Sequence, residues 1–484
     1  MNYRMMGRFM ALTMAVETLF MLPPLFISLF LGEESSFKGF LITILISLGI
    51  ELTLFLLCKG APKLFQAKEG FVCVTLSWVV LSIVGCLPFV ISGAIPNFID
   101  ALFETVSGFS TTGATVISDV EILPKGILYW RSFAHWLGGM GVLVFLLALT
   151  SSSGKEGGFT MHLLRAESPG PDVGKLVPRM RTTAIILYLI YIGLSILNLI
   201  FLLFGGMSLF DALCTMFGTV GTGGLSISNT SLADYSVYIQ IVTAVFMVLA
   251  GINFSCYFFI ILRQFKAVFK DEELKLYLGI VAASIIFIAI NIYKIYGSVG
   301  ETLLHSAFQV SSIITTTGYT TTDFNLWPAF SKAILLFLMI TGGCAGGTAG
   351  GLKMTRVLIL IKSLRRNIRK IIHPNKVLVV RSNDKIISER VLDTTNAYLA
   401  AYVTIIVASF LVVSLDDFSV TTNLSAVIAC FNNIGVGLDG VGPGCNFGDY
   451  SILSKLVLIF DMLAGRLEIF PILALFSSST WRHK

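Results

Sequence analysis

Long apolar runs separated by short polar stretches occupy almost the whole chain. Most runs approach or exceed the length of about 20 residues that a helix needs to cross about 30 Å of hydrocarbon. Two of them, at 9–31 and 39–57, lead the chain, and four pairs follow. The pairs lie at about 71–92 and 126–150, 183–204 and 234–262, 274–295 and 329–364, and 395–415 and 451–478. The pattern predicts an all-α polytopic membrane protein with ten spans.

The composition agrees with this class and excludes several functions. Of the 484 residues, 55% are hydrophobic and only 13% are charged, well outside the usual range of soluble domains. A second span follows the first closely, so we expect the first to be retained rather than cleaved as a signal peptide. The eight cysteines show no CxxC or paired spacing, and HExxH and GxxxxGKS/T motifs are absent. We therefore expect no enzyme and no nucleic-acid partner.

The basic residues predict how the chain is oriented. Lys and Arg gather in the connections 59–68, 155–181 and 263–275, and eleven of them lie in 353–390. By the positive-inside rule these connections face the cytoplasm, as do both termini. The connection 151–178 is expected to be cytoplasmic as well. The basic segment 362–376 determines topology in the simplest interpretation, and anionic lipid or a cytosolic partner is the alternative.

Each of the four pairs of spans encloses a short polar tract that contains glycine. The tracts are Ser110-Thr111-Thr112-Gly113, Gly221-Thr222-Gly223-Gly224, Thr315-Thr316-Thr317-Gly318 and Ile434-Gly435-Val436-Gly437. When the last glycines are placed in register, the apolar segments that begin at Asp100, Asp211, His305 and Leu424 align without gaps. The chain thus divides into a leading two-span segment and four repeats, with expected boundaries at 1–62, 63–160, 161–265, 266–375 and 376–484.

The segment before each tract is too short to cross a membrane, at about 10 to 14 residues. We expect it to be a re-entrant helix whose carbonyl end, the negative end of its dipole, points at a central axis and favours a cation there. The tract then lines the axis with backbone oxygens, which can replace the water around a cation. Four units of the same orientation should be related by rotation about an axis along the membrane normal. The alternative is four ordinary Gly/Thr-rich external loops.

Acidic and basic side chains near the tracts suggest structural roles. Asp100, Asp211 and His305 are expected at helix starts, where capping and the helix dipole favour acids, and an outer acidic ring is the alternative for them and Glu104. Arg131 and His135 are expected to be interfacial or structural.

The second span of each pair contains a break at small residues, 24 to 28 residues after the aligned glycine. The breaks are Gly138-Gly139, Gly251, Gly342-Gly343 and Gly465. The third is the largest, with Gly342, Gly343, Gly346, Gly347, Gly350 and Gly351 within ten residues. At about 1 kcal/mol per glycine, a continuous helix there is disfavoured by about 6 kcal/mol. We expect a movable loop below the filter, and close helix packing of the GxxxG type is the alternative.

Arg466 lies within the last predicted span. An arginine at mid-membrane costs about 2.5–3.5 kcal/mol unless it is paired or hydrated. Glu468 is a poor direct partner for Arg466 because it is only two residues away. We therefore expect carbonyl groups of the glycine loop to accept the hydrogen bonds of Arg466. We predict that Arg466 and the glycine loop form a gate. A structural bridge to another span or to Asp461 is the alternative.

These motifs resemble those of the Trk/Ktr/HKT superfamily of potassium transporters, and the bacterial Trk-type membrane subunit in particular. The resemblance rests on the four tracts, on Trp130-Arg131-Ser132 and 135–141, on the glycine run 342–351, and on 463–470. It implies a homodimer in the bacterial inner membrane, with one pore per protomer. It also implies a cytosolic regulatory subunit of the RCK type, which would bind the nucleotide.

We therefore expect gated, channel-like uptake of potassium, which binds at the sixteen tract residues. No covalent cofactor is expected. The alternative is a potassium symporter that is coupled to protons or sodium.

Overall fold

The computed structural model describes residues 3–60, 67–141, 180–383, 385–477 and 481. The described chain is almost wholly helical, and its strands form one short antiparallel pair, β1 (Arg381–Ser382) and β2 (Lys385–Ile386). The predicted loop 151–178, the end of the first repeat's second span and the boundaries near 62 and 160 lie outside the described residues.

A leading segment and four units make up the fold. The leading segment holds α1 (Tyr3–Phe20), α2 (Leu22–Phe30) and α3 (Glu34–Leu57). Unit 1 holds α4 (Ala67–Ile91), α5 (Phe98–Phe109) and α6 (Lys125–Gly139), and unit 2 holds α9 (Met180–Phe204), α10 (Leu209–Val220), α11 (Val237–Ala250), α12 (Phe254–Ile261) and α13 (Phe265–Lys270). Unit 3 holds α14 (Glu272–Tyr296), α15 (Val299–Ile314), η1 (Phe324–Leu326), α16 (Ala329–Thr341) and α17 (Met354–Ile372), and unit 4 holds α18 (Glu389–Val413), α19 (Val420–Phe431), η2 (Asp439–Val441), α20 (Ile452–Arg466) and α21 (Phe470–Phe476).

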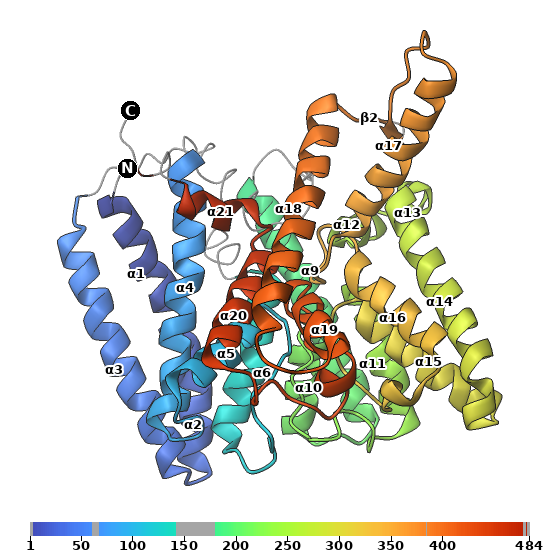
Figure 1. The fold of residues 1–484 in the computed structure, drawn as a ribbon. Coiled ribbons are helices and arrows are strands. Elements are labelled where there is room, and N and C mark those ends of the chain that lie inside the picture. The colour runs from blue at the N-terminus through green and yellow to red at the C-terminus, as the bar shows by residue number, and fades with distance from the viewer. Residues whose placement is uncertain (1–2, 61–66, 142–179, 384, 478–480, 482–484) are drawn as a thin grey trace.

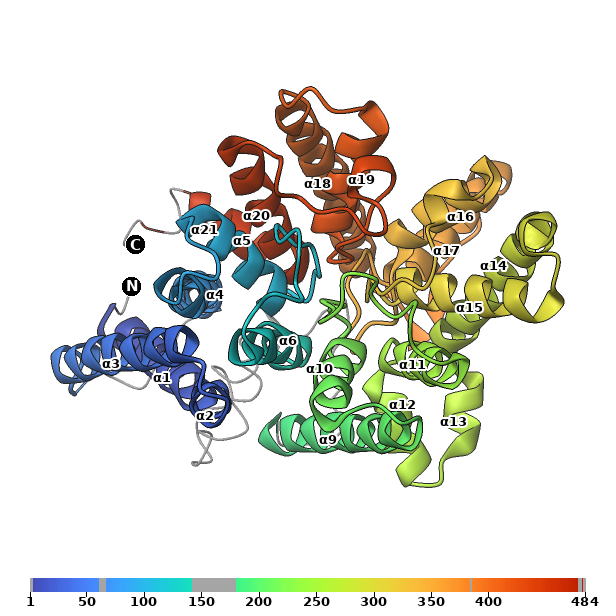
Figure 2. The ribbon, with the colours of Figure 1, turned by 90° about the horizontal axis from the view of Figure 1, so that it is seen from below.

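The four units surround a central axis, and the leading helices lie outside unit 1 (Figures 1 and 2). Loops from all four units converge at the centre of the view along this axis. The predicted fold class, an all-α membrane protein with four repeats and two leading spans, is confirmed.

The ten predicted spans fall into two kinds. Among the described residues, six helical stretches are long and apolar enough to cross a membrane, and they correspond to the two leading spans and the first span of each unit. The second spans are interrupted where the sequence predicts: α6 ends at Gly139, α11 at Ala250, α16 at Thr341 and α20 at Arg466. The bend between α11 and α12 is 91°. In units 2 to 4, where the chain beyond the break is described, the breaks therefore divide the second spans instead of packing within continuous helices.

The short helices α5, α10 and α19 have 12 residues each, and α15 has 16. Side chains of Asn97, Ser208 and Ser419 cap the starts of the three 12-residue helices. Asp100 and Asp211 lie in first turns, as predicted, where the helix dipole favours an acid. The expectation for His305 is wrong, because α15 already begins at Val299 and His305 lies inside it.

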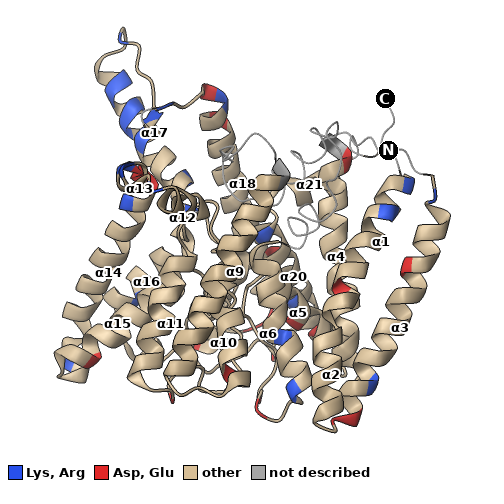
Figure 3. Cartoon of the chain, turned by 180° about the vertical axis from the view of Figure 1, so that it is seen from behind, with Lys and Arg blue, Asp and Glu red and all other residues tan. Residues whose placement is uncertain are grey.

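Charged side chains are unevenly distributed between the two ends of the molecule. Lys and Arg gather at the end where α13 and α17 project, whereas Asp and Glu predominate in the turns at the opposite end (Figure 3). The first residues of α1 lie at the basic end, and so does α21. This asymmetry agrees with the predicted alternation of connections.

Candidate cation pathway

The four short helices end in the same backbone motif. The residues that follow α5, α10, α15 and α19 directly are Ser110, Gly221, Thr315 and Asn432. In each unit, the residue two positions after this one donates its N–H to the carbonyl of the residue five positions before itself. The four bonds are Thr112 to Ser107 at 2.9 Å, Gly223 to Gly218 at 2.9 Å, Thr317 to Ser312 at 2.8 Å and Ile434 to Ala429 at 2.8 Å. This is the Schellman ending of a helix.

The residue between these two positions is left-handed in every unit and is never glycine. The φ angles are 58° at Thr111, 54° at Thr222, 54° at Thr316 and 57° at Asn433. A threonine in this region is strained, and such strain persists only where the surrounding structure enforces it. Strain of this kind clusters at functional sites. Two residues later, a glycine again has positive φ: 83° at Gly113, 70° at Gly224, 86° at Gly318 and 81° at Gly435.

This geometry corrects the predicted register of the fourth tract by two residues. The equivalent of Gly113 is Gly435, and the fourth tract runs from Asn432 to Gly435. Gly437 instead donates its N–H to Val441 and lies against Ser425 outside the motif. The gapless alignment is wrong there because it matches the dipeptide Ser306-Ala307 of unit 3 with Ser425-Ala426 of unit 4.

Of the four residues predicted in that tract, only two belong to it. Ile434 and Gly435 lie in the motif, whereas Val436 and Gly437 follow it. Asn432 and Asn433 were missed. The available signal was chemical, because asparagine tolerates the left-handed conformation better than most residues.

The four glycines close a ring around the axis. A Cβ atom built on each one would meet the carbonyl oxygen that precedes the glycine of the next unit. The distances are 2.1 Å from Gly113 to Gly223 O, 1.8 Å from Gly224 to Thr317 O, 2.2 Å from Gly318 to Ile434 O, and 2.4 Å from Gly435 to Thr112 O. The fourth contact returns to unit 1, so the units follow one another in chain order around the axis. No side chain larger than hydrogen fits at these positions.

The ring is buried and electrically negative. Ser110, Thr111, Thr112, Thr222 and Thr315 to Thr317 are fully buried. The carbonyl ends of α5, α10, α15 and α19, which carry the negative ends of the helix dipoles, lead directly into it. Backbone oxygens from four directions are the groups that replace water around a monovalent cation.

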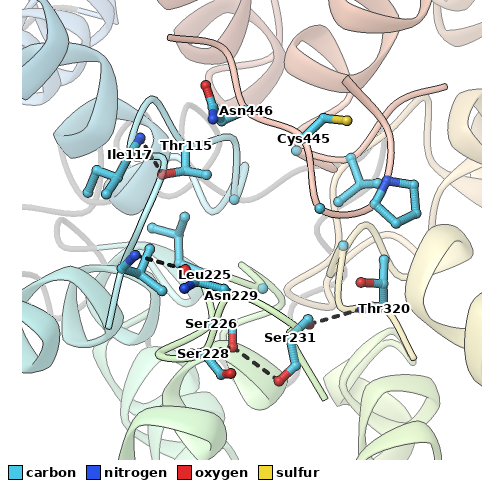
Figure 4. Close-up of a pocket in the computed structure, with 18 of the residues that line it drawn as sticks. Thr115, Ile117, Leu225, Ser226, Ser228, Asn229, Ser231, Thr320, Cys445 and Asn446 are labelled. Carbon is cyan, nitrogen blue, oxygen red and sulfur yellow. Dashed lines mark hydrogen bonds between the residues drawn. The ribbon is translucent and has the colours of Figure 1, made fainter. Parts of the chain in front are cut away.

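A cavity of about 130 Å³ opens on one side of the ring. It is lined by Gly113, Gly224, Gly318 and Gly435 and by outer loops of all four units. Figure 4 shows residues that each unit contributes to the lining: Thr115 and Ile117 from unit 1, Leu225, Ser226, Ser228, Asn229 and Ser231 from unit 2, Thr320 from unit 3, and Cys445 and Asn446 from unit 4. The cavity therefore forms a vestibule on the acidic side of the molecule.

Glu104 and Arg131 form an ion pair beside the ring. Arg131 is among the residues that line the vestibule, whereas Glu104 is not, so Glu104 does not contribute to an outer acidic ring there. Arg131 Nε lies 2.6 Å from Glu104 Oε1, and both side chains are buried. Glu104 also accepts from the N–H of Val116, and Arg131 donates to the carbonyl of Ser226 in unit 2. These buried contacts agree with the structural role expected for Arg131. His135 is also buried and packs on the backbone at Gly223.

The glycine loop lies against the other side of the ring. Residues 342–353 join α16 to α17 without helix, so the predicted loop is present. Gly350 donates its N–H to Thr316 Oγ1 at 2.6 Å, and a Cβ on Gly350 would lie 2.4 Å from Asn432 O. Cys344 donates to the carbonyl of Gly251, at the break of unit 2. The loop is thus held between the ring and a neighbouring unit.

Arg466 connects three segments beneath the ring. Its guanidinium donates to the carbonyls of Gly138 and Gly139 at the end of α6, the second at 2.8 Å. It also donates to Thr348 O in the glycine loop at 3.1 Å and lies 3.4 Å from Thr111 Oγ1. The predicted hydrogen bond to a carbonyl of the glycine loop is confirmed at Thr348. The hydrogen bonds to the end of α6 were not predicted. A cation at a helix carbonyl end is favourable.

Two charged neighbours of the loop were also missed from the sequence. Lys353 is 3% exposed, with its ammonium on the carbonyl of Ala349. Glu273 of α14 accepts from the N–H of Ala345 at 2.6 Å. Glu468 pairs with Arg356, in agreement with the expectation that it is a poor partner for Arg466. Asp461, the other predicted partner, accepts from Ser409.

Comparisons with known proteins place this geometry in a family. The Trk system potassium uptake protein TrkH of Salmonella typhimurium is 35% identical over 492 residues, which cover all of both chains. TrkG of Escherichia coli, also named a Trk system potassium uptake protein, is 34% identical over 96% of each chain. The crystal structure of the potassium transporter TrkH from Vibrio parahaemolyticus superposes with a TM-score of 0.88 at 32% identity, over 100% of both chains. The sequence profile of the TrkH family, described as "Cation transport protein", matches residues 36–482, and the chain belongs to this family.

Proposed function

We propose that this protein takes up potassium across the bacterial cytoplasmic membrane through the ring of four tracts. The closed cycle of glycine-to-carbonyl contacts carries the proposal, because it brings backbone oxygens of all four units to one axis. Potassium would bind as the transported ion to carbonyls of Ser110 to Gly113, Gly221 to Gly224, Thr315 to Gly318 and Asn432 to Gly435. The names of the relatives, which are potassium uptake proteins, support the choice of ion.

The gate in this proposal consists of the glycine loop and Arg466. The loop blocks the side of the ring opposite the vestibule, and Arg466 adds a positive charge next to Thr111. Both must move for a cation to leave the ring. The hydrogen bond from Arg466 to Thr348 O links the two elements.

The basic end of the molecule faces the cytoplasm in this proposal, together with both termini, and the vestibule faces outward. The resemblance to the Trk type supports a homodimer and a cytosolic RCK-type subunit that binds the nucleotide. Neither a covalent cofactor nor a nucleic acid has a part in the proposal.

Flux through purified protein in liposomes tests the proposed ion and mechanism. We expect currents that follow the potassium gradient alone, with potassium and rubidium more permeant than sodium and lithium. Equal permeability of the four ions would refute a potassium filter. Potassium entry that stops when a proton or sodium gradient is removed would refute a channel-like mechanism.

Two buried carboxyls favour a test of the symport alternative. Both carboxyl oxygens of Glu17 in α1 are buried and have no hydrogen-bond partner among the described residues. One carboxyl oxygen of Asp461 in α20, Oδ2, is also buried and has none there. Ionisable groups within the membrane are candidates for proton transfer. If transport is proton-coupled, Glu17→Gln or Asp461→Asn should abolish its dependence on the proton gradient. If the channel proposal holds, both variants should show the flux ratios of the wild type at every pH.

Cys445 allows the vestibule to be tested without a new mutation. Of the eight cysteines it alone is exposed, and it lines the vestibule. We expect external methanethiosulfonate ethylammonium to reduce potassium uptake by more than about half, because the added positive charge repels cations at the entrance. Cys445→Ser should be insensitive.

The rate of this modification should depend on pH. Partial burial, together with the carboxylates of Asp323 and Asp439, raises the pKa of the Cys445 thiol. The thiolate is the reactive form, so modification should accelerate as the pH rises above neutrality. Full uptake by protein that mass spectrometry shows to be modified would remove the vestibule from the pathway.

A further inference from the structure

A basic pocket lies on the projecting part of α17, outside the cation pathway. Its volume is about 220 Å³, and five cationic side chains line it: Lys362, Arg365, Arg366, Arg369 and Arg381. The first four share one helix face, since they are three or four positions apart. The chain returns to this face through β1, where Lys362 donates to the carbonyl of Arg381 at 2.8 Å.

An apolar contact holds the returning segment in place. Val380, which precedes β1, packs with Ile359 of α17 and Leu392 of α18, and all three are buried. The segment that closes the pocket is therefore packed against both α17 and α18.

The positive charge of the pocket is only partly neutralised. Lys362 pairs with Glu272 at the start of α14, and Arg366 pairs with Glu389 at the start of α18. Arg365, Arg369 and Arg381 have no carboxylate within 4.0 Å in the described part of the chain. Like charges at these helix spacings repel one another, so an anion would stabilise the arrangement.

One donor in the pocket is buried and unused. Arg366 Nε is shielded from solvent without a hydrogen-bond partner among the described residues. A buried donor without an acceptor is costly. An anion with several acceptor oxygens would satisfy it, and arginine guanidinium groups bind phosphate oxygens in pairs.

We propose that this pocket binds a phosphate group. The pocket lies where α14 and α18 begin, on the side that we assign to the cytoplasm. Both an anionic lipid headgroup and a soluble polyphosphate can reach this level. Its position also connects it to the loop beneath the ring, because Glu272 contacts the pocket while the adjacent Glu273 holds Ala345. Binding is measured without ion flux, so the test does not depend on the proposed transport function.

Calorimetric titration of pyrophosphate into the full-length protein tests the proposal. The protein is held in nanodiscs of phosphatidylcholine at low salt. We expect saturable binding that Arg365→Gln together with Arg369→Gln weakens by about tenfold or more, since each arginine supplies charge-assisted hydrogen bonds. Neither arginine has an ion pair to lose among the described residues, so the variant should keep the thermal stability of the wild type.

Lys376→Gln together with Arg390→Gln is the matched control, because it removes two positive charges near the pocket but outside its lining. We expect it to bind pyrophosphate within about twofold of the wild type. Absence of saturable binding, or equal weakening by the two double variants, would overturn the proposal. Nanodiscs of phosphatidylglycerol then identify the source: competition with pyrophosphate indicates a lipid headgroup, and unchanged binding indicates a soluble phosphate.

Discussion

Gly435→Ala is expected to abolish selective potassium uptake. The new Cβ would lie 2.3 Å from the carbonyl carbon of Gly113 and 2.4 Å from Thr112 O, both backbone atoms of the ring. Backbone atoms cannot rotate aside as a side-chain end can, and the φ of 81° adds the strain of a left-handed alanine, about 1–2 kcal/mol. The ring must open between units 4 and 1. We expect at least about a tenfold loss of potassium flux or of potassium-over-sodium preference, measured in liposomes.

Gly437→Ala is the control that separates the structural register from the register predicted by sequence alignment. Its Cβ would meet Val441 Cγ2 at 2.7 Å and Ser425 Oγ at 2.9 Å, which are side-chain atoms, and the nearest backbone atom, Ser425 O, lies at 3.2 Å instead of the 2.3–2.4 Å at Gly435. The backbone at Gly437 is not in the left-handed region. We expect flux within about twofold of the wild type. The opposite result, with Gly437→Ala inactive and Gly435→Ala normal, would restore the alignment and remove Asn432 and Asn433 from the ring.

The spans were predictable because the membrane imposes their length. A run of about 20 apolar residues is typical of a membrane span and rare elsewhere. A short apolar helix that is followed by glycine and lies between two such spans favours re-entry, because it cannot reach the other side. The glycine breaks were visible for a similar reason, since Gly342 to Gly351 cannot continue a helix at low cost.

The fourth tract was mispredicted because its chemistry differs from that of the other three. Asn433 performs in unit 4 the left-handed turn that Thr111, Thr222 and Thr316 perform elsewhere. An alignment that places the last glycine of each tract in register and matches dipeptides does not find it. The backbone, with one hydrogen-bond pattern in all four units, is what repeats.

The contacts of Arg466 were only partly predictable. Its position in an apolar span required partners, and the glycine loop was a reasonable choice. The carbonyls of Gly138 and Gly139 lie more than 300 positions away in sequence. Arg466 and these carbonyls meet only because units 4 and 1 are neighbours around the axis. No local sequence pattern predicts that arrangement. Lys353 was missed because a single cation beside six glycines has no periodicity.

Arg466→Gln is expected to raise basal potassium flux. The guanidinium lies 3.4 Å from Thr111 Oγ1, next to the ring. A positive unit charge about 8 Å from a permeating cation, at an effective dielectric constant of about 20, raises the energy of that cation by roughly 2 kcal/mol, which corresponds to about a thirtyfold lower rate. Glutamine removes the charge and releases Thr348 of the glycine loop. The measurement is potassium flux in liposomes without any partner protein.

Arg466→Lys separates the two ways in which the arginine could close the pathway. Lysine keeps the positive charge but cannot reproduce the forked contacts with Gly138, Gly139 and Thr348. Low flux in the lysine variant would assign the block to charge, and flux as high as in Arg466→Gln would assign it to bracing of the loop. A structural bridge without a gating role predicts a third pattern, in which both variants lose thermal stability and neither conducts more than the wild type. Because that pattern is distinct from the other two, it would refute the gate.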